Sequence, residues 1–299
     1  MCLNSSPELY LDQTTAISTL SKALKSGYLS LFLGAGVSRS ATEAFPDWVS
    51  LVKRCCETKG IPFEDDSKES NDYLRKIMES VERKCVSDDF IKLVESNLYM
   101  GVTYDKRLMK TDLLVSLGSL VMTSVRGGAR AVVNYNFDDL IEWYLGYHGF
   151  TLEVVSMLPT LTSKVDVQIY HPHGFIPKLD KYLDKKTRHL IATEKAYQLE
   201  ICSEVSPWNE LQRSIICSTL CLFVGLSGDD PHIDSICTKV YEKLIEKKRI
   251  LGFIILLDNK KNRKNEDHSL ARGLVPIYIK SHNDLPDFLL NICQAAAEI

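Results

Sequence analysis

The sequence lacks the features of several large protein classes. No apolar run approaches the roughly 18 residues that a membrane helix needs, and the longest, residues 250–257, suits a buried strand. The N-terminus has neither the basic region nor the apolar core of a secretory signal peptide. A net charge of −3 over 299 residues gives no general attraction to nucleic acid or anionic membranes. These absences predict a cytoplasmic protein without membrane contact or direct nucleic-acid binding.

The nine cysteines also lack the spacing of a metal or redox site. No Cys-x-x-Cys pair occurs, although such pairs mark zinc ribbons and thioredoxin-like motifs. The sequence therefore predicts reduced thiols, no bound metal and no zinc module.

Short apolar strands alternate with amphipathic helices along most of the chain. This alternation predicts an α/β fold, with a Rossmann-like parallel sheet and helices on both faces, in a single domain over residues 1–299. The predicted strands include residues 29–33, 129–134, 151–156, 168–170, 220–224, 250–257 and 276–279, and the predicted helices include 12–25, 138–147, 193–202, 207–218, 230–247 and 285–297.

The stretch between the first two strands has helical periodicity without strand alternation, most clearly over residues 74–122. We therefore expect a helical insertion over approximately residues 60–125. Oligomer contacts, a lid and a simple cover of the sheet face all stay open as its role.

A glycine turn follows the first predicted strand, in the sequence Gly34-Ala-Gly-Val-Ser38. Glycines at a strand-to-helix turn let the backbone approach a phosphate, and the helix N-terminus adds N–H donors. The dehydrogenase fingerprint requires a third glycine where this chain has Arg39, and an acidic residue at a later strand end. Glu57, at that distance, lies in a helical stretch, so the turn favours a nucleotide site but not an NAD-dependent dehydrogenase.

Polar side chains follow the second predicted strand. Asn136 and Asp138 lie at the carboxyl end of this strand, which is the rim where ligands bind in open parallel sheets. As an alternative, Asp138 or Asp139 caps the helix that follows, and for Asp139 this is the favoured interpretation. Asn136 has no comparable capping role and is the stronger functional candidate.

Two further motifs lie near later strands. His171-Pro-His-Gly174 contains histidines that can accept or donate a proton near neutral pH, although a hydrogen-bonded structural histidine stays open as an alternative. Gly225-Leu-Ser227 follows an apolar strand and is typical of a second phosphate- or ribose-contacting turn. Asp230, just beyond it, is expected to cap the helix that begins at Pro231.

Together the four motifs resemble those of the sirtuin superfamily (silent information regulator 2-like), specifically the sirtuin-like NADase domains of bacterial anti-phage defence systems. The first turn resembles the family's GAG-x-S, Asn136-Phe-Asp138 its N-x-D, His173-Gly174 its catalytic His-Gly, and Gly225-Leu-Ser227 its G-x-S. The resemblance covers roughly residues 20–285. Asn134 and Tyr135 depart from the threonines usual before the N-x-D element, and the zinc module of deacylating sirtuins is missing.

The resemblance implies that the chain hydrolyses NAD+ to ADP-ribose and nicotinamide, with no cofactor beyond NAD+ as substrate. By resemblance, Asn136 orients water or the ribose, Asp138 holds the nicotinamide carboxamide, and His173 acts as base. The residues implied to hold the phosphates and the adenosine ribose are Gly34, Ala35, Gly36, Ser38, Gly225 and Ser227.

Two other functions stay open: a sirtuin-type deacylase or ADP-ribosyltransferase, and a non-catalytic subunit that binds NAD or ADP-ribose. The missing zinc cysteines argue against the first, and retention of Asn136 and His173 argues against the second. An unregulated NADase would harm its own host. We therefore expect a latent effector that depletes NAD in anti-phage defence, controlled by homo-oligomerisation or by a partner ATPase or nucleic-acid-sensing protein.

Overall fold

A seven-stranded sheet forms the centre of the computed structural model, in which residues 10–64, 70–86, 89–122, 127–159, 165–179, 189–203, 205–227, 230–244 and 249–299 are described. The strand order is β3-β4-β2-β1-β7-β8-β9, and every neighbouring pair runs parallel. The predicted Rossmann-like α/β fold is therefore confirmed. The strands are β1 (Leu29–Leu33), β2 (Ala131–Asn134), β3 (Leu152–Val155), β4 (Val167–Tyr170), β7 (Leu220–Val224), β8 (Gly252–Leu257) and β9 (Leu274–Ile279).

Helices cover both faces of this sheet, because successive side chains of a strand point to opposite sides. In β1, Leu31 and Leu33 belong to one core with α1 (Gln13–Lys25), α7 (Asp112–Val121), α8 (Leu140–Tyr147) and α13 (Leu285–Glu298). Phe32 belongs to the other core, with α10 (Pro207–Ser218) and α11 (Pro231–Glu242). Strands buried on both faces explain the continuous apolar runs in the sequence.

The central strand β1 is the point at which the chain changes direction across the sheet. Leu33, its last residue, pairs with Asn134 of β2 on one side and with Val224 of β7 on the other. The carboxyl ends of these three strands therefore meet at one edge. Such a switch point is where open α/β sheets bind ligands.

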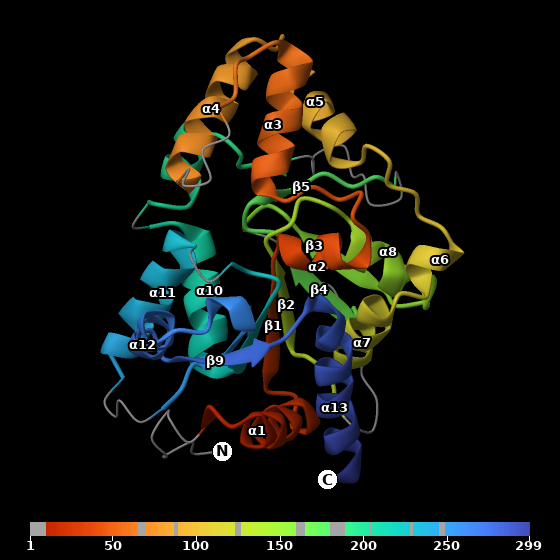
Figure 1. The fold of residues 1–299 in the computed structure, drawn as a ribbon, viewed down its shortest axis with the longest axis vertical. Helices are drawn as coiled ribbons and strands as arrows, with labels where there is room; N and C mark the ends of the chain where they lie inside the picture. Colours follow the sequence, from red (N-terminus) through yellow and green to blue (C-terminus); the bar gives the residue numbers. More distant parts are fainter. Residues whose placement is uncertain are drawn as a thin grey trace.

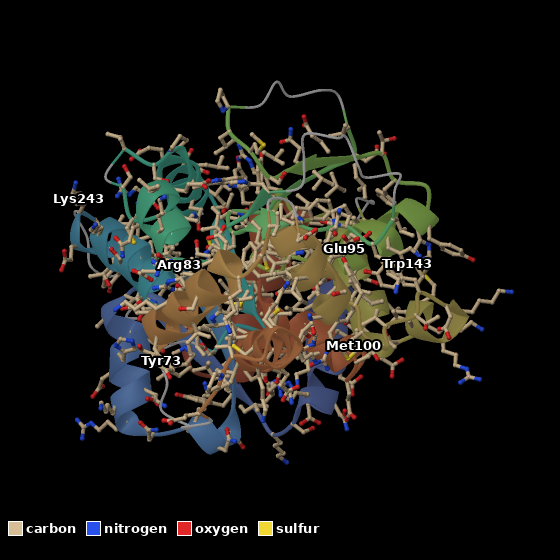
Figure 2. The ribbon with its side chains drawn as sticks, turned by 90° about the horizontal axis from the view of Figure 1, so that it is seen from above. Tyr73, Arg83, Glu95, Met100, Trp143 and Lys243 are labelled. Atoms are coloured by element: carbon tan, nitrogen blue, oxygen red, sulfur yellow. The ribbon has the colours of Figure 1, made fainter. Side chains whose placement is uncertain are left out.

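The predicted insertion is helical, with α4 (Asn71–Arg83), α5 (Asp89–Leu98), α6 (Lys106–Met109) and α7. Figure 1 shows α4 and α5, together with α3 (Trp48–Lys59), beyond the carboxyl ends of the central strands and opposite α1. Figure 2 views the molecule from this end, with Tyr73 and Arg83 of α4 labelled. The insertion therefore covers the edge of the sheet where the motifs lie.

The structure corrects several element predictions. Residues expected to connect β8 and β9 contain helix α12 (Arg263–Ala271), and β9 begins before the predicted residue 276. α9 (Glu194–Glu200) is shorter than predicted, and β5 (Gly174–Phe175) forms a small antiparallel pair with β6 (His189–Leu190). Over the described ranges, no helix is long and apolar enough to cross a membrane.

Candidate active site

The turns that follow β1, β2 and β7 line one cavity of about 980 Å³. This volume lies at the upper end of the roughly 300–1,000 Å³ typical of ligand pockets. The insertion contributes Leu74 and Arg75 to the cavity wall. The structure thus brings together every residue predicted for the site: Gly34, Ala35, Gly36, Ser38, Asn136, Asp138, His173, Gly225 and Ser227.

The two glycine turns pack directly against each other. Gly34 N donates to Val224 O, and Gly36 N donates to Gly225 O, both at 2.9 Å. A Cβ on Gly36 would lie 2.8 Å from Gly225 Cα, and a Cβ on Gly225 would lie 2.6 Å from Val37 N. Gly225 also has a φ of +71°, which disfavours other residues. Close packing of the two turns therefore requires these glycines, independently of any phosphate.

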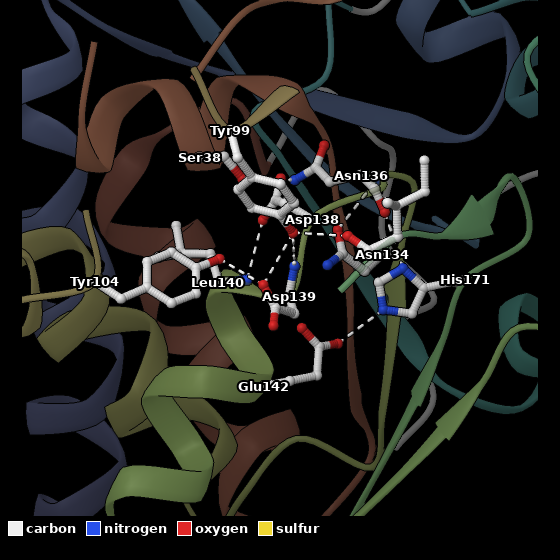
Figure 3. A network of polar contacts seen from close by, with 11 residues as sticks. Ser38, Tyr99, Tyr104, Asn134, Asn136, Asp138, Asp139, Leu140, Glu142 and His171 are labelled. Carbon is white, nitrogen blue, oxygen red and sulfur yellow. Dashed lines mark hydrogen bonds and ion pairs between the residues drawn. The ribbon is translucent and has the colours of Figure 1, made fainter. Parts of the chain in front are cut away.

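Asn136 lies in a buried hydrogen-bond network at the carboxyl end of β2 (Figure 3). Its Nδ2 donates to Gly34 O at 3.0 Å and to Ser38 Oγ at 3.2 Å. Ser38 Oγ donates in turn to Asp138 Oδ2 at 2.8 Å. The Asn136 amide is thereby held in one orientation. Its Oδ1 accepts no hydrogen bond from the described part of the chain and is left available to a ligand in the cavity.

The Asp138 carboxyl group titrates near neutral pH. Burial is the largest cause and raises its pKa from 3.8 to about 7, while hydrogen bonds from Ser38 and the Leu140 N–H act in the opposite direction. The negative charges of Glu142 and Asp139 raise the pKa further. Asp138 can therefore donate or accept a hydrogen bond at physiological pH. Ser38, expected to donate to a phosphate, directs its hydroxyl hydrogen to this carboxyl instead.

Asp139 does not cap α8 with its side chain, although it occupies the N-cap position. Its carboxylate accepts from Tyr99 Oη at 2.9 Å, Tyr104 Oη at 2.6 Å and Leu179 N at 3.0 Å. The favoured prediction that Asp139 caps the helix is therefore wrong. Through the hydrogen bonds from the two tyrosines, the carboxylate instead connects the segment after β2 to the segment that follows α5. Asp230 does cap α11, as predicted, through the His232 and Ile233 N–H groups.

His173 is a neutral, half-buried acceptor on the same cavity. Its ring centroid lies 5.0 Å from that of Tyr135 and 6.1 Å from that of Tyr197. Burial lowers the pKa of His173 to about 4, and the positive charge of Arg75 lowers it further. Within the described ranges, His173 Nε2 has no hydrogen-bond partner. An unprotonated imidazole in this position can take a proton from water or a ribose hydroxyl.

No motif of the sequence indicates a role for Arg75. This side chain of α4 is 9% exposed, donates from Nε to Glu194 Oε2 at 2.8 Å, and lies 3.7 Å from the centroid of the Tyr197 ring. Asp72 forms a second ion pair with it. Arg75 therefore joins the insertion to α9 at the wall of the cavity. Arginines on amphipathic helices are mostly exposed, so no sequence pattern singles this one out.

Comparison with known families gives one match. Residues 130–277 match the family model described as a SIR2-like domain. The matched segment runs from just before β2 into β9 and contains the Asn136, His173 and Gly225 motifs. No curated protein matches the chain. In the described ranges, no group of three or more His, Cys, Asp or Glu side chains is arranged to hold a metal ion.

Proposed function

We propose that this chain, which carries a SIR2-like domain over residues 130–277, is an NAD+ hydrolase. A SIR2-like domain indicates an NAD-related activity in general terms. The reaction cleaves the bond between nicotinamide and ribose and yields nicotinamide and ADP-ribose. The observation that carries the proposal is the placement of the oriented Asn136 amide, the Asp138 carboxyl and the neutral His173 ring on one cavity.

The chemistry needs few protein groups. The bond from ribose C1′ to the pyridinium nitrogen breaks, and its electron pair leaves with nicotinamide as a neutral molecule. Water attacks the oxocarbenium-like carbon and gives up a proton. The protein has to hold the two reactants in line and accept that proton.

Each polar group of the site has a matching role in this proposal. Asn136 Oδ1 accepts a hydrogen from the attacking water or a ribose hydroxyl, because its Nδ2 is already engaged. His173 takes the proton at a ring nitrogen that burial keeps unprotonated. Asp138, with a pKa of about 7, can donate to the oxygen of the nicotinamide carboxamide or accept from its nitrogen.

The remainder of the dinucleotide is assigned to the two glycine turns. The residues of these turns on the cavity wall are Gly34, Ala35, Gly36, Ser38, Gly225 and Ser227. Lys260 also lines the cavity and donates to Ser227 O at 2.6 Å, which places a cation beside the second turn. A cation beside this turn suits a pyrophosphate.

The family resemblance extends the proposal to biology. The chain would be a latent cytoplasmic effector of anti-phage defence that depletes NAD+ when activated. A homo-oligomer, or a partner ATPase or nucleic-acid-sensing protein, would control it. Native mass and activity measured together test this part, and full activity in a fixed monomer without a partner would contradict it.

The hydrolase itself is tested by incubating purified protein with NAD+ and quantifying nicotinamide and ADP-ribose by chromatography. Asn136→Ala and His173→Ala should each abolish release. The matched controls are Asn291→Ala and His148→Ala, which change exposed side chains on α13 and after α8 and should leave release unchanged. Folded wild-type protein that neither binds NAD+ nor releases nicotinamide, even with enzyme in excess over NAD+ and across the concentrations at which it assembles, would overturn the proposal.

A further inference from the structure

Glu142 and His171 form a fully buried pair beneath Asn136 (Figure 3). Glu142 lies in α8 and His171 directly follows β4, and neither side chain is exposed. His171 Nε2 lies 2.7 Å from Glu142 Oε1, and its Nδ1 lies 2.9 Å from the backbone oxygen of Asn136. The Phe175 ring packs beside the imidazole, with centroids 4.5 Å apart.

These contacts determine how many hydrogens the pair holds. The carbonyl oxygen of Asn136 can only accept, so His171 Nδ1 must carry a hydrogen and donate it. A second hydrogen must lie between Nε2 and the Glu142 carboxyl, since two lone pairs would repel at 2.7 Å. Whether this hydrogen resides on the ring or on the carboxyl, the pair is neutral overall. Burial therefore leaves no uncompensated charge, and the imidazole is held from both nitrogens.

Neither residue lines the cavity, so any effect on a ligand must pass through another group. The group they hold is the peptide unit that carries Asn136. The backbone oxygen of Asn136 is fixed by His171, and its backbone nitrogen donates to Asn134 Oδ1 at 3.1 Å. With the main chain fixed on both sides, the Asn136 amide reaches Gly34 O and Ser38 Oγ.

We propose that Glu142 and His171 are positioning residues for NAD+ hydrolysis, which orient the Asn136 amide by holding its backbone carbonyl. This inference rests on the proposed function, since it assigns the pair to that reaction. It gives a role to His171, which belongs to the motif His171-Pro-His-Gly174, and to Glu142 of α8, neither of which the chemistry of the site uses. A misplacement of a reacting group by about 1 Å can cost on the order of 100-fold in rate.

Two double variants separate positioning from general support of the fold. Glu142→Leu with His171→Leu removes the buried pair but leaves an apolar filling, and the Asn136 carbonyl loses its donor. Glu142→Leu with His171→Asn makes the same change at position 142 but retains an amide donor near the place of Nδ1. We expect kcat to fall about 100-fold in the first variant, with KM for NAD+ changed less than about threefold. The second variant should recover at least about tenfold of that loss.

The single variant Glu142→Gln keeps the shape of the pair, because its amide can donate to Nε2 while Nδ1 still donates to Asn136. We expect its kcat to stay within about threefold of the wild type. The matched control removes another His–Glu pair, His189 with Glu200, whose side chains are 2.6 Å apart but partly exposed. Replacing both with leucine should leave kcat unchanged.

The outcomes divide clearly. Equal kcat in the two double variants overturns the proposal, as does a loss above about tenfold in Glu142→Gln with an unchanged melting temperature. If both double variants fail to fold, Glu142→Gln decides alone. If the wild type neither binds NAD+ nor releases nicotinamide, the proposed function fails instead. Crystal structures of the variants then show whether the Asn136 amide has left Gly34 O and Ser38 Oγ, and an unmoved amide overturns the positioning role.

Discussion

Replacing Asp138 with asparagine should stabilise the protein above neutral pH and not below pH 5. The carboxyl ionises at a pKa of 3.8 in the unfolded chain but at about 7 in the folded protein, because burial penalises its charge. Between these values the folded protein holds a proton that the unfolded chain has released. The free energy of unfolding therefore falls as the pH rises from about 4 to 7.

The magnitude follows from the difference of about 3 pH units between the two pKa values. Each pH unit corresponds to about 1.4 kcal/mol, so the ionised carboxyl lowers the free energy of unfolding by about 4 kcal/mol at pH 8. Asparagine avoids this penalty but loses the hydrogen bond from Ser38, at a cost of about 1 kcal/mol. The variant should then gain about 3 kcal/mol at pH 8, or about 6 °C in melting temperature for a chain of this size.

Differential scanning calorimetry of both proteins at pH 5 and pH 8 measures this difference. The melting temperatures should nearly coincide at pH 5 and separate at pH 8, with the variant higher. Asp287→Asn, at an exposed position of α13, controls for the exchange of a carboxylate for an amide. A difference of the same size at both pH values would contradict this prediction, because it would show that Asp138 does not titrate between them. The more stable variant should still release less nicotinamide, since an amide cannot replace every hydrogen bond of the carboxyl.

Three further substitutions test contacts around the cavity. Gly36→Ala should lower the melting temperature, because its Cβ would lie 2.8 Å from Gly225 Cα and overpacking costs about 1–3 kcal/mol; calorimetry measures the loss. Arg75→Met should raise the pKa of His173 by removing a nearby positive charge, which an NMR titration of the ring protons detects. Tyr104→Phe should lower the free energy of unfolding by about 1–3 kcal/mol, because a buried carboxylate loses a donor at 2.6 Å; urea denaturation tests it.

Two of these changes have matched controls on the surface. Arg83, on the same helix as Arg75, has a side chain that is 74% exposed, so Arg83→Met should leave the His173 titration unchanged. Tyr147 is 66% exposed, so Tyr147→Phe should leave the unfolding free energy unchanged. An equal effect in a variant and its control would contradict the contact on which the prediction depends. For Gly36→Ala, an unchanged melting temperature would show that the two turns can separate without cost.

The sequence predicts the sheet well because its strands are apolar and end at polar turns. The bounds of β1, β7 and α10 agree with the predicted segments. Helix α12 was missed for a physical reason: Ser269 is its one buried residue, so it carries no apolar stripe that a periodicity could reveal.

The candidate site was predictable to the extent that it lies at strand ends. Parallel strands in register bring their carboxyl ends to one edge, so motifs far apart in the sequence meet there. The contribution of Arg75 was not predictable, since its burial depends on contact between α4 and α9. The same holds for the pairing of Glu142 with His171, because a local pattern does not show which buried groups face each other.

The placement of β1 between β2 and β7 has a consequence for how the chain folds. Leu31 pairs with Val132 and with Leu222, so the central strand finds its second neighbour only after most of the chain has been synthesised. Non-local pairing of this kind slows folding, because the loop must close before the contacts form. The glycine turn that follows β1 is equally incomplete until β7 arrives to pack against it. An N-terminal fragment that ends before β7 should therefore have no finished cavity, and a nascent chain would gain the ability to bind a dinucleotide only late in its synthesis.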